Sequence, residues 1–301
     1  MLQSRRTVLT ACICALSGAI VLTRSKRVLA ADITYKYDDL GRVVQVNYPD
    51  GTQTVYSYDL AGNRTQVSRS NVNAATLVQV TSASNLRALA NAAGYTGASS
   101  ANYQFVVASG TSVLGAANGG IAIDTGAWPA GVSLALVVNG NVYGGGGKGG
   151  NGSASVAGGN GAAGGDAVYC QYPISITVNA GGSIKGGGGG GGGGSYNTVA
   201  GGKKGGGGGG GGFPNGGGGS GGVGNKGTGG VGAGGTTSGG GAGGASTPAG
   251  NGGSGGNAGA AGNPGNGEDY TSSGGAAGYA VRKNGNAVTV SNSGTVTGPV
   301  G

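Results

Sequence analysis

Residues 186–194 read GGGGGGGGG and residues 205–212 read GGGGGGGG, and both runs lie inside a longer glycine-rich stretch, 144–278. That stretch holds 63 of the 80 glycines in the chain. Glycine loses more backbone freedom on folding than any other residue, and it has no side chain to bury. An ordinary hydrophobic core therefore cannot form from this stretch, and a flexible linker is the simplest interpretation.

A three-residue glycine period favours an ordered alternative. A polyproline-II-type helix has three residues per turn, so glycine at every third position lies along one edge, where such helices can pack closely and hydrogen-bond. Collagen is excluded because it needs many prolines, and only Pro264 lies in the second frame. We predict packed polyglycine helices and keep the flexible linker as the alternative. The frames comprise Gly146, Gly149, Gly152, Gly158, Gly161 and Gly164, and then Gly250, Gly253, Gly256, Gly259, Gly262 and Gly265.

The composition offers little material for catalysis. The 301 residues include no histidine, and Glu268 is the sole glutamate among nine acidic residues. Histidine is the commonest general base and metal ligand. Asp166 and Asp269 are too isolated to suggest a metal site, and no segment has the GxxxxGKS or GxxxxGKT order of a phosphate-binding loop. We therefore expect a non-enzymatic protein without a metal or cofactor.

Residues 1–30 resemble a bacterial export signal. An arginine pair at 5–6 precedes an apolar run that ends near Leu22, and residues 28–30 offer a small-residue cleavage site. The pair resembles a twin-arginine signal, and the run is short for a transmembrane span. We expect an exported protein, extracellular or at the cell surface, with no stable transmembrane span after cleavage. An uncleaved anchor and a lipoprotein box at 9–12 are the alternatives.

Removal of this leader changes the charge and the cysteine count. The chain carries a net charge of +8, and without the leader 12 basic and 9 acidic residues remain, a net charge of +3. The basic isoelectric point thus partly reflects the leader, and we expect no nucleic-acid partner. Cys170 is the one cysteine beyond the leader. We interpret it as a buried free thiol, with intermolecular pairing as the alternative.

Two copies of a tyrosine–aspartate unit occupy residues 33–68. The first contains YKYDDLGRVVQV and the second, 21 residues later, contains YSYDLAGNRTQV. Alternating tyrosine and valine around the turn signal YPDG at 48–51 predicts antiparallel hairpins over 31–70. The unit resembles the YD repeats of the Rhs family, which implies strand hairpins and a cell-surface setting. Family members with many copies form a hollow shell, and two copies are too few to enclose anything. The tyrosines either pack across strands or stack on sugars: Tyr35, Tyr37, Tyr56 and Tyr58.

A second pattern recurs three times around the glycine-rich stretch. Two apolar residues at alternate positions are followed four residues later by a glycine, and an apolar residue and a second glycine then follow at intervals of two residues. Each copy follows another short apolar segment, and a unit of roughly 22–25 residues cannot bury its apolar face unless units stack. We predict a mainly β fold, a small β-solenoid-like stack from which the inserts 145–164 and 187–277 leave on one side. Hairpins in a sandwich are the alternative, because Asn139-Gly140 is a hairpin signal. The copies are Leu134, Leu136, Gly140, Val142 and Gly144; Ile176, Val178, Gly182, Ile184 and Gly186; and Val288, Val290, Gly294, Val296 and Gly298.

We place the glycine-rich β domain at residues 103–301, after a linker at 71–102 that holds a short helix over 85–93. Trp128 is expected to cap an apolar end of this domain. The domain is similar to the glycine-rich C-terminal regions of phage tail proteins. In some tail-fibre adhesins a bundle of polyglycine helices presents receptor-binding loops, and the resemblance implies the same here. The export signal departs from that family and favours a bacterial envelope or secreted protein.

Residues that interrupt the long insert are the candidate binding residues, because they would form loop tips. Exposed aromatic rings beside lysine and asparagine suit contact with a cell-surface glycan or protein; solvated loops or sealed bundle ends are the alternative. We expect an adhesin-like protein, with a structural envelope or matrix protein and a phage tail-type receptor-binding protein as alternatives. A homo-oligomer stays open. The candidates are Tyr196, Asn197, Lys203, Lys204, Phe213, Asn215 and Tyr270.

Overall fold

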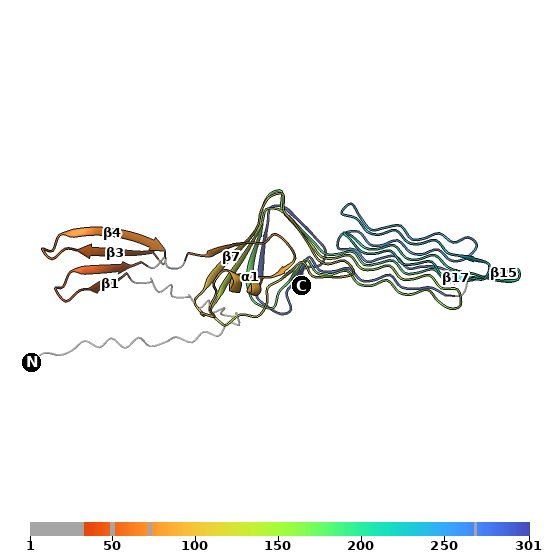
Figure 1. Ribbon diagram of the computed structural model, residues 1–301, viewed down its shortest axis with the longest axis horizontal. Helices are drawn as coiled ribbons and strands as arrows, with labels where there is room; N and C mark the ends of the chain where they lie inside the picture. The colour runs from red at the N-terminus through yellow and green to blue at the C-terminus, as the bar shows by residue number, and fades with distance from the viewer. Residues whose placement is uncertain (1–32, 49–51, 72–73, 268–269) are drawn as a thin grey trace, which may run out of the picture. The chain divides into compact units, whose positions relative to one another are not determined.

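The computed structural model describes residues 33–48, 52–71, 74–267 and 270–301 (Figure 1). The chain divides into two compact units, Met1–Val72 and Asn73–Gly301. The expected export signal at 1–30 lies outside the described residues. Within the described part of the chain, no helix has the length and apolar character needed to cross a membrane.

The first unit is a four-stranded antiparallel sheet, and its strands follow one another in chain order. Each YD copy forms a hairpin, as predicted, because its tyrosine- and valine-rich halves pair across a short turn. The strands are β1 (Thr34–Tyr37), β2 (Val43–Asn47), β3 (Thr52–Tyr58) and β4 (Arg64–Asn71).

Equivalent aspartates close the two hairpin tips. Asp38 Oδ1 accepts a hydrogen bond from the backbone N–H of Arg42 at 2.8 Å, and Asp59 Oδ1 accepts one from Asn63 at 2.8 Å. Within each tip a glycine has φ of +74° or +89°, the left-handed region that favours glycine. One turn geometry therefore explains why both Asp and Gly recur in the repeat.

These hydrogen bonds stabilise the ionised carboxylates, so we predict an acid-sensitive hairpin tip. The backbone N–H of Arg42 lowers the pKa of Asp38, and the side-chain amide of Asn63 lowers the pKa of Asp59. A lowered folded-state pKa contributes stability that is complete above the unfolded value of about 3.9 and is lost as the pH falls through the folded value. NMR titration should place both carboxyls below their values in the unfolded chain. Equal or higher folded values would contradict the predicted tip geometry.

Three parallel sheets form the core of the second unit, and each takes strands from successive passes of the chain. Neighbouring strands are parallel and far apart in sequence, so the chain winds in layers. The mainly β class is confirmed. The hairpin alternative is wrong, because β10 and β11, on either side of Asn139-Gly140, lie in different sheets. The first sheet contains β5 (Thr76–Gln79), β7 (Asn102–Val107), β10 (Ser133–Val138), β13 (Ile174–Val178) and β20 (Val288–Asn292); the second, β8 (Ser112–Leu114), β11 (Asn141–Tyr143), β14 (Ser183–Lys185) and β21 (Thr295–Thr297); the third, β6 (Ser84–Asn85), β9 (Ile123–Asp124), β12 (Val168–Tyr169) and β19 (Val281–Arg282).

Apolar side chains of one layer lie directly over those of the next. Val142 pairs with Ile184, and Ile184 pairs with Val296, as the repeated pattern predicts. The register in the first sheet differs from the expected one. The pattern would pair Leu134 of β10 with Ile176 of β13, whereas Leu136 pairs with Ile176. The reason is turn length, since two residues follow β10 and four follow β13. A shift of two residues keeps the same face of each strand in the core.

Residues 76–92, expected in a linker, instead begin the stack. β5 pairs with β7, and β6 pairs with β9. The predicted helix is α1 (Leu86–Ala92), and its N-cap Asn85 accepts a hydrogen bond from Ala88 N at 3.1 Å. Trp128 caps the apolar end as expected, with 8% of its surface exposed and its ring 5.2 Å from that of Tyr95.

Cys170 is a buried free thiol, as we interpreted it. Burial raises the pKa of this thiol to about 12. The thiol therefore stays protonated at neutral pH, where it is unreactive and belongs to the apolar core.

Both glycine-rich inserts leave the stack at the same corner, between the second and third sheets. The first insert joins β11 to β12, and the second joins β14 to β19. At this corner Gly145 donates to Gly120 O at 2.8 Å and Gly187 donates to Gly165 O at 2.9 Å. The inserts therefore extend from stacked layers as one bundle, which confirms that they lie together (Figure 1).

Two segments, 187–195 and 205–213, form the centre of the bundle. Along 187–195, each backbone N–H donates to a different neighbouring segment from the one before, and the direction repeats every third residue. The carbonyl oxygens accept from three further segments in the same way, so six segments surround this one. Residues 205–213 are surrounded similarly. Three successive donors illustrate the pattern: Gly190 to Ala162 O (2.8 Å), Gly191 to Gly210 O (2.7 Å) and Gly192 to Asn263 O (2.9 Å).

This arrangement explains why residues 187–194 and 205–212 are all glycine. A Cβ on Gly190 would lie 2.0 Å from Lys148 O, and one on Gly191 would lie 2.0 Å from Gly253 O. Outer segments have an open side, so they tolerate other residues; a Cβ on Gly234 would meet nothing closer than 3.4 Å. The flexible-linker alternative is wrong for these segments. The threefold pattern is the one polyglycine helices require, and that helical conformation stays a prediction.

Asparagine side chains satisfy backbone N–H groups on the outside of the bundle. Asn257 Oδ1 accepts from Gly240 N at 3.1 Å, and Asn160 Oδ1 accepts from Ser273 N at 2.9 Å. A side-chain oxygen here takes the place of the neighbouring carbonyl that a central segment would have. The outer segments thus keep their amides paired without another backbone beside them.

Candidate functional site

The turns at the end of the bundle that lies far from the β stack carry aromatic and charged side chains (Figure 1). Several turns meet there, and we call three of them, together with Tyr270, the distal tip: residues 196–204, 223–228 and 246–249. Figure 1 shows β15 and β17 at this end of the bundle. Two turns are hairpins, formed by β15 (Asn197–Val199) with β16 (Gly202–Lys204) and by β17 (Val223–Gly224) with β18 (Gly227–Thr228).

Hydrogen bonds join the turns of the distal tip to one another. Lys203 N donates to Asn225 Oδ1 at 2.7 Å, which links the two hairpins. Asn197 Nδ2 donates to Pro248 O at 2.8 Å, and the Lys204 ammonium donates to Thr247 O. The tip is therefore a single connected surface.

Two tyrosines form the aromatic part of the tip, and a lysine lies beside them. The rings of Tyr196 and Tyr270 lie 6.4 Å apart between centroids, tilted by 39°. Tyr270 is 45% exposed. Lys203 Nζ lies 4.0 Å from the centroid of the Tyr196 ring, a cation–π contact. Tyr196 is half-buried, and the exposed Tyr270 ring beside it and the lysine can contact both apolar and polar groups of another molecule.

Five of the seven candidate residues lie in the distal tip, and Phe213 and Asn215 do not. These two lie at the other end of the bundle, beside the β stack. Phe213 is 2% exposed, and its ring centroid is 5.2 Å from that of Tyr143. Asn215 donates to Gly115 O at 2.9 Å and accepts from Gly146 N at 3.0 Å. Their contacts are internal, so we leave them out of the site proposed below.

Sequence reasoning missed the tip segments 223–228 and 246–249. Both interrupt the glycine frame, as VGNKGT and STPA, so the signal was the same one that identified Tyr196. Val223 is 76% exposed, and Asn225 and Lys226 are also exposed. These residues enlarge the tip and add a third lysine to it.

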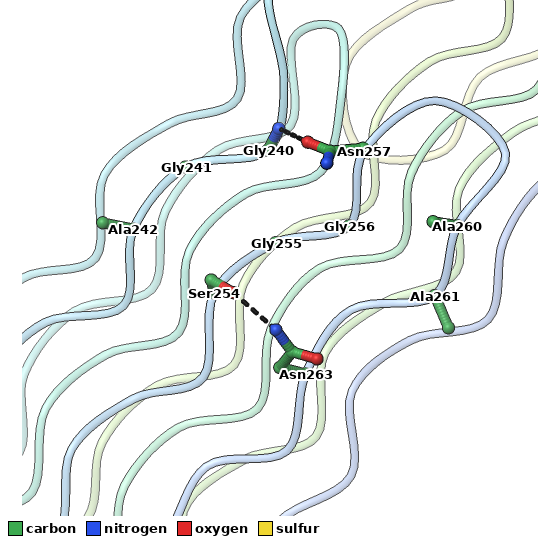
Figure 2. Close-up of a pocket in the computed structure, with 10 residues that line it drawn as sticks. All are labelled: Gly240, Gly241, Ala242, Ser254, Gly255, Gly256, Asn257, Ala260, Ala261 and Asn263. Carbon is green, nitrogen blue, oxygen red and sulfur yellow. Dashed lines mark hydrogen bonds between the residues drawn. The ribbon is translucent and has the colours of Figure 1, made fainter.

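A groove of about 490 Å³ lies on the flank of the bundle, outside the distal tip (Figure 2). Glycine, alanine, serine and asparagine line it, without an aromatic or charged side chain. Its polar side chains are partly paired, since Asn263 Nδ2 donates to Ser254 Oγ at 2.7 Å and Asn257 Oδ1 accepts from Gly240 N, and only small side chains surround them. This groove therefore has little to offer a ligand, and the distal tip is the better candidate.

The fold defines a class of protein: a layered β base from which a hydrogen-bonded glycine bundle presents side chains at its free end. The chain belongs to the phage tail fibre adhesin Gp38 family, whose model matches residues 71–301. A model of the RHS repeat matches residues 37–71. Both resemblances expected from the sequence are thus confirmed.

Among solved structures, the chain is similar to one described as the gp37-gp38 adhesin tip complex of the bacteriophage S16 long tail fiber. The match has 24% sequence identity and a TM-score of 0.50, and it covers 77% of this chain and 83% of the other. At that identity it supports the fold alone. The comparison with curated proteins gave no significant match.

Proposed function

We propose that this protein is a non-enzymatic receptor-binding adhesin, and that its distal tip contacts a molecule on a cell surface. The observation that carries the proposal is the concentration of Tyr196, Tyr270 and Lys203 at the free end of a bundle built mostly of glycine. The flanks of the bundle offer chiefly backbone and small side chains. A partner that needs aromatic or charged contacts would meet them at the tip.

The bundle suits this role because it holds the tip in a fixed position. Each central segment is hydrogen-bonded to six neighbours, and the turns of the tip are bonded to one another. A site held rigid before binding loses less conformational entropy when the partner arrives. Membership of an adhesin family supports the same reading. If the protein were instead a structural component of an envelope or matrix, the bundle itself would carry the function and the tip side chains would be dispensable.

Binding to intact bacterial cells tests the proposal. We predict that Y196A/Y270A weakens binding of the purified protein at least tenfold, because two central aromatic contacts are lost. The matched control is T236A/T237A/S238A, at a turn on the opposite end of the bundle. Binding that survives in the tip variant would reject the distal tip as the site. A wild-type protein that binds no cells of a broad panel would favour the structural alternative.

We also propose that the chain is exported, on the evidence of the arginine pair and apolar run within residues 1–30. A mature N-terminus at Ala31 in protein recovered from the medium is the expected finding.

A further inference from the structure

A polar groove of about 340 Å³ lies at the edge of the distal tip. It runs between the turn 246–249 and the segment that leads to Tyr270, and Asn197, Asn251 and Asn266 line it together with Pro248 and Gly267. Ligand sites span roughly 300–1,000 Å³, so this groove suits a small ligand or a short part of a larger one.

Two of the asparagines have amide nitrogens available to a ligand. Asn251 Oδ1 accepts from Ser246 N, and Asn266 Oδ1 accepts from Asn251 N, both at 2.7 Å. These bonds fix each side chain by its oxygen and leave each Nδ2 without a partner among the described residues. Both side chains are exposed. The groove therefore presents two oriented N–H donors from neighbouring segments. In the flank groove the Asn263 amide donates to Ser254, which leaves the Asn257 amide there without a partner among the described residues (Figure 2).

The third asparagine holds the wall of the groove in place. Asn197 Nδ2 donates to Pro248 O, while Asn197 Oδ1 is buried and has no hydrogen-bond partner within the described part of the chain. Buried polar atoms are nearly always paired in folded proteins, and an unpaired one costs about 1–3 kcal/mol. Because this oxygen is buried, a ligand in the groove does not reach it, and Asn197 contributes to the groove by holding Pro248 in its wall.

The groove lies beside the segments that carry the aromatic part of the tip. Gly267 lines the groove and lies against the Ser195 hydroxyl, which donates to Tyr270 O at 3.3 Å. Ser195 directly precedes Tyr196. Free amide donors thus lie near one exposed and one half-buried tyrosine ring. Sugars combine closely spaced hydroxyl groups, which donate and accept, with an apolar C–H face that packs on aromatic rings.

We propose that this groove is a saccharide subsite, which takes a short, hydroxyl-rich segment of a cell-surface glycan. The inference rests on the proposed adhesin function and names the chemistry of its receptor. Asn251 and Asn266 donate to ring or hydroxyl oxygens of the saccharide, and Tyr196 or Tyr270 packs on its C–H face. A protein loop is the competing occupant and is an outcome of the test.

The test uses N251D/N266D in the full-length protein. Aspartate keeps the side-chain oxygens that hold Ser246 N and Asn251 N, so the tip stays folded, but it removes both Nδ2 donors. The matched control is N257D, at an asparagine that caps Gly240 N on the flank. Cell binding is measured for each variant, with oligosaccharides released from the surface of the bound strain as competitor. Protease-treated cells are tested in parallel.

We expect the released oligosaccharides to compete with binding, N251D/N266D to weaken it at least tenfold, and N257D to bind like the wild type. Binding that resists the oligosaccharides and disappears on protease-treated cells would overturn the saccharide subsite and leave the adhesin intact. Unchanged binding by N251D/N266D would also overturn it. Loss of binding in Y196A/Y270A reports on the adhesin proposal separately, so the two failures are distinguishable.

Discussion

Replacement of Gly191 with alanine is expected to disrupt the centre of the glycine bundle. The new Cβ would lie 2.0 Å from Gly253 O, which is backbone and already accepts a hydrogen bond from Gly210 N. Neither side can move without breaking bonds to further segments. Overpacking of a core costs about 1–3 kcal/mol, and we expect a value near 3 kcal/mol here. For a unit of this size that lowers the Tm by roughly 6–12 °C.

Gly234 provides the matched control. It lies in an outer segment, is exposed, and would place its Cβ 3.4 Å from Gly216 O, an ordinary contact. G234A should therefore leave the Tm unchanged or raise it slightly, because alanine reduces the entropy of the unfolded chain. Amide hydrogen exchange should show faster exchange across 187–195 in G191A alone. Equal behaviour of the two variants would mean that the segments do not pack as described.

The contrast between these glycines shows what the sequence can and cannot predict. The three-residue period identifies segments with one bare edge, and it predicted close packing of the inserts. It does not distinguish Gly191 from Gly234, because that depends on how many neighbours each segment has. The number of neighbours follows from the order in which the chain passes back and forth, which is a property of the whole bundle. An uninterrupted glycine run is the local sign of a central position.

The β stack was predictable to a similar degree. Alternating apolar residues such as Val142 and Ile184 identified the repeated layers and the buried face. Turn lengths then set the register, so the expected partner of Ile176 was two residues away from Leu136, the true one. The first layer escaped detection because it has no strand in the second sheet and so lacks half of the repeated pattern.

The sequence predicted which residue types form the candidate site better than it predicted where those residues lie in the bundle. Interruptions in the glycine runs correctly suggested turns, and Tyr196 and Tyr270 do meet. The sequence could not say at which end of the bundle a turn lies. Phe213 therefore looked equivalent to Tyr196, although it seals the junction with the β stack. Which end a turn occupies depends on the number of preceding reversals.

Loss of the Asp166 carboxylate is expected to destabilise the corner where the long insert returns to the stack. Asp166 is 5% exposed and lies just before β12, and Arg282 lies at the end of β19. The carboxylate accepts from Arg282 Nε at 2.6 Å, from Arg282 Nη2 at 3.1 Å and from Tyr279 N at 2.9 Å. It therefore ties together two strands that the whole second insert separates. Removal of one partner of a buried pair costs about 3–5 kcal/mol.

Arg282 is 39% exposed, so water compensates part of that loss, and we expect D166A to cost about 2–3 kcal/mol in the free energy of unfolding. R282M should also destabilise, because it leaves a buried carboxylate without its cation. The double variant D166N/R282M should be clearly less destabilised than the sum of D166N and R282M, since no unpaired charge remains. Denaturant unfolding of the wild type, D166N, R282M and the double variant measures this coupling. Additive effects would show that the two side chains do not interact, and would contradict the ion pair as the clasp between β12 and β19.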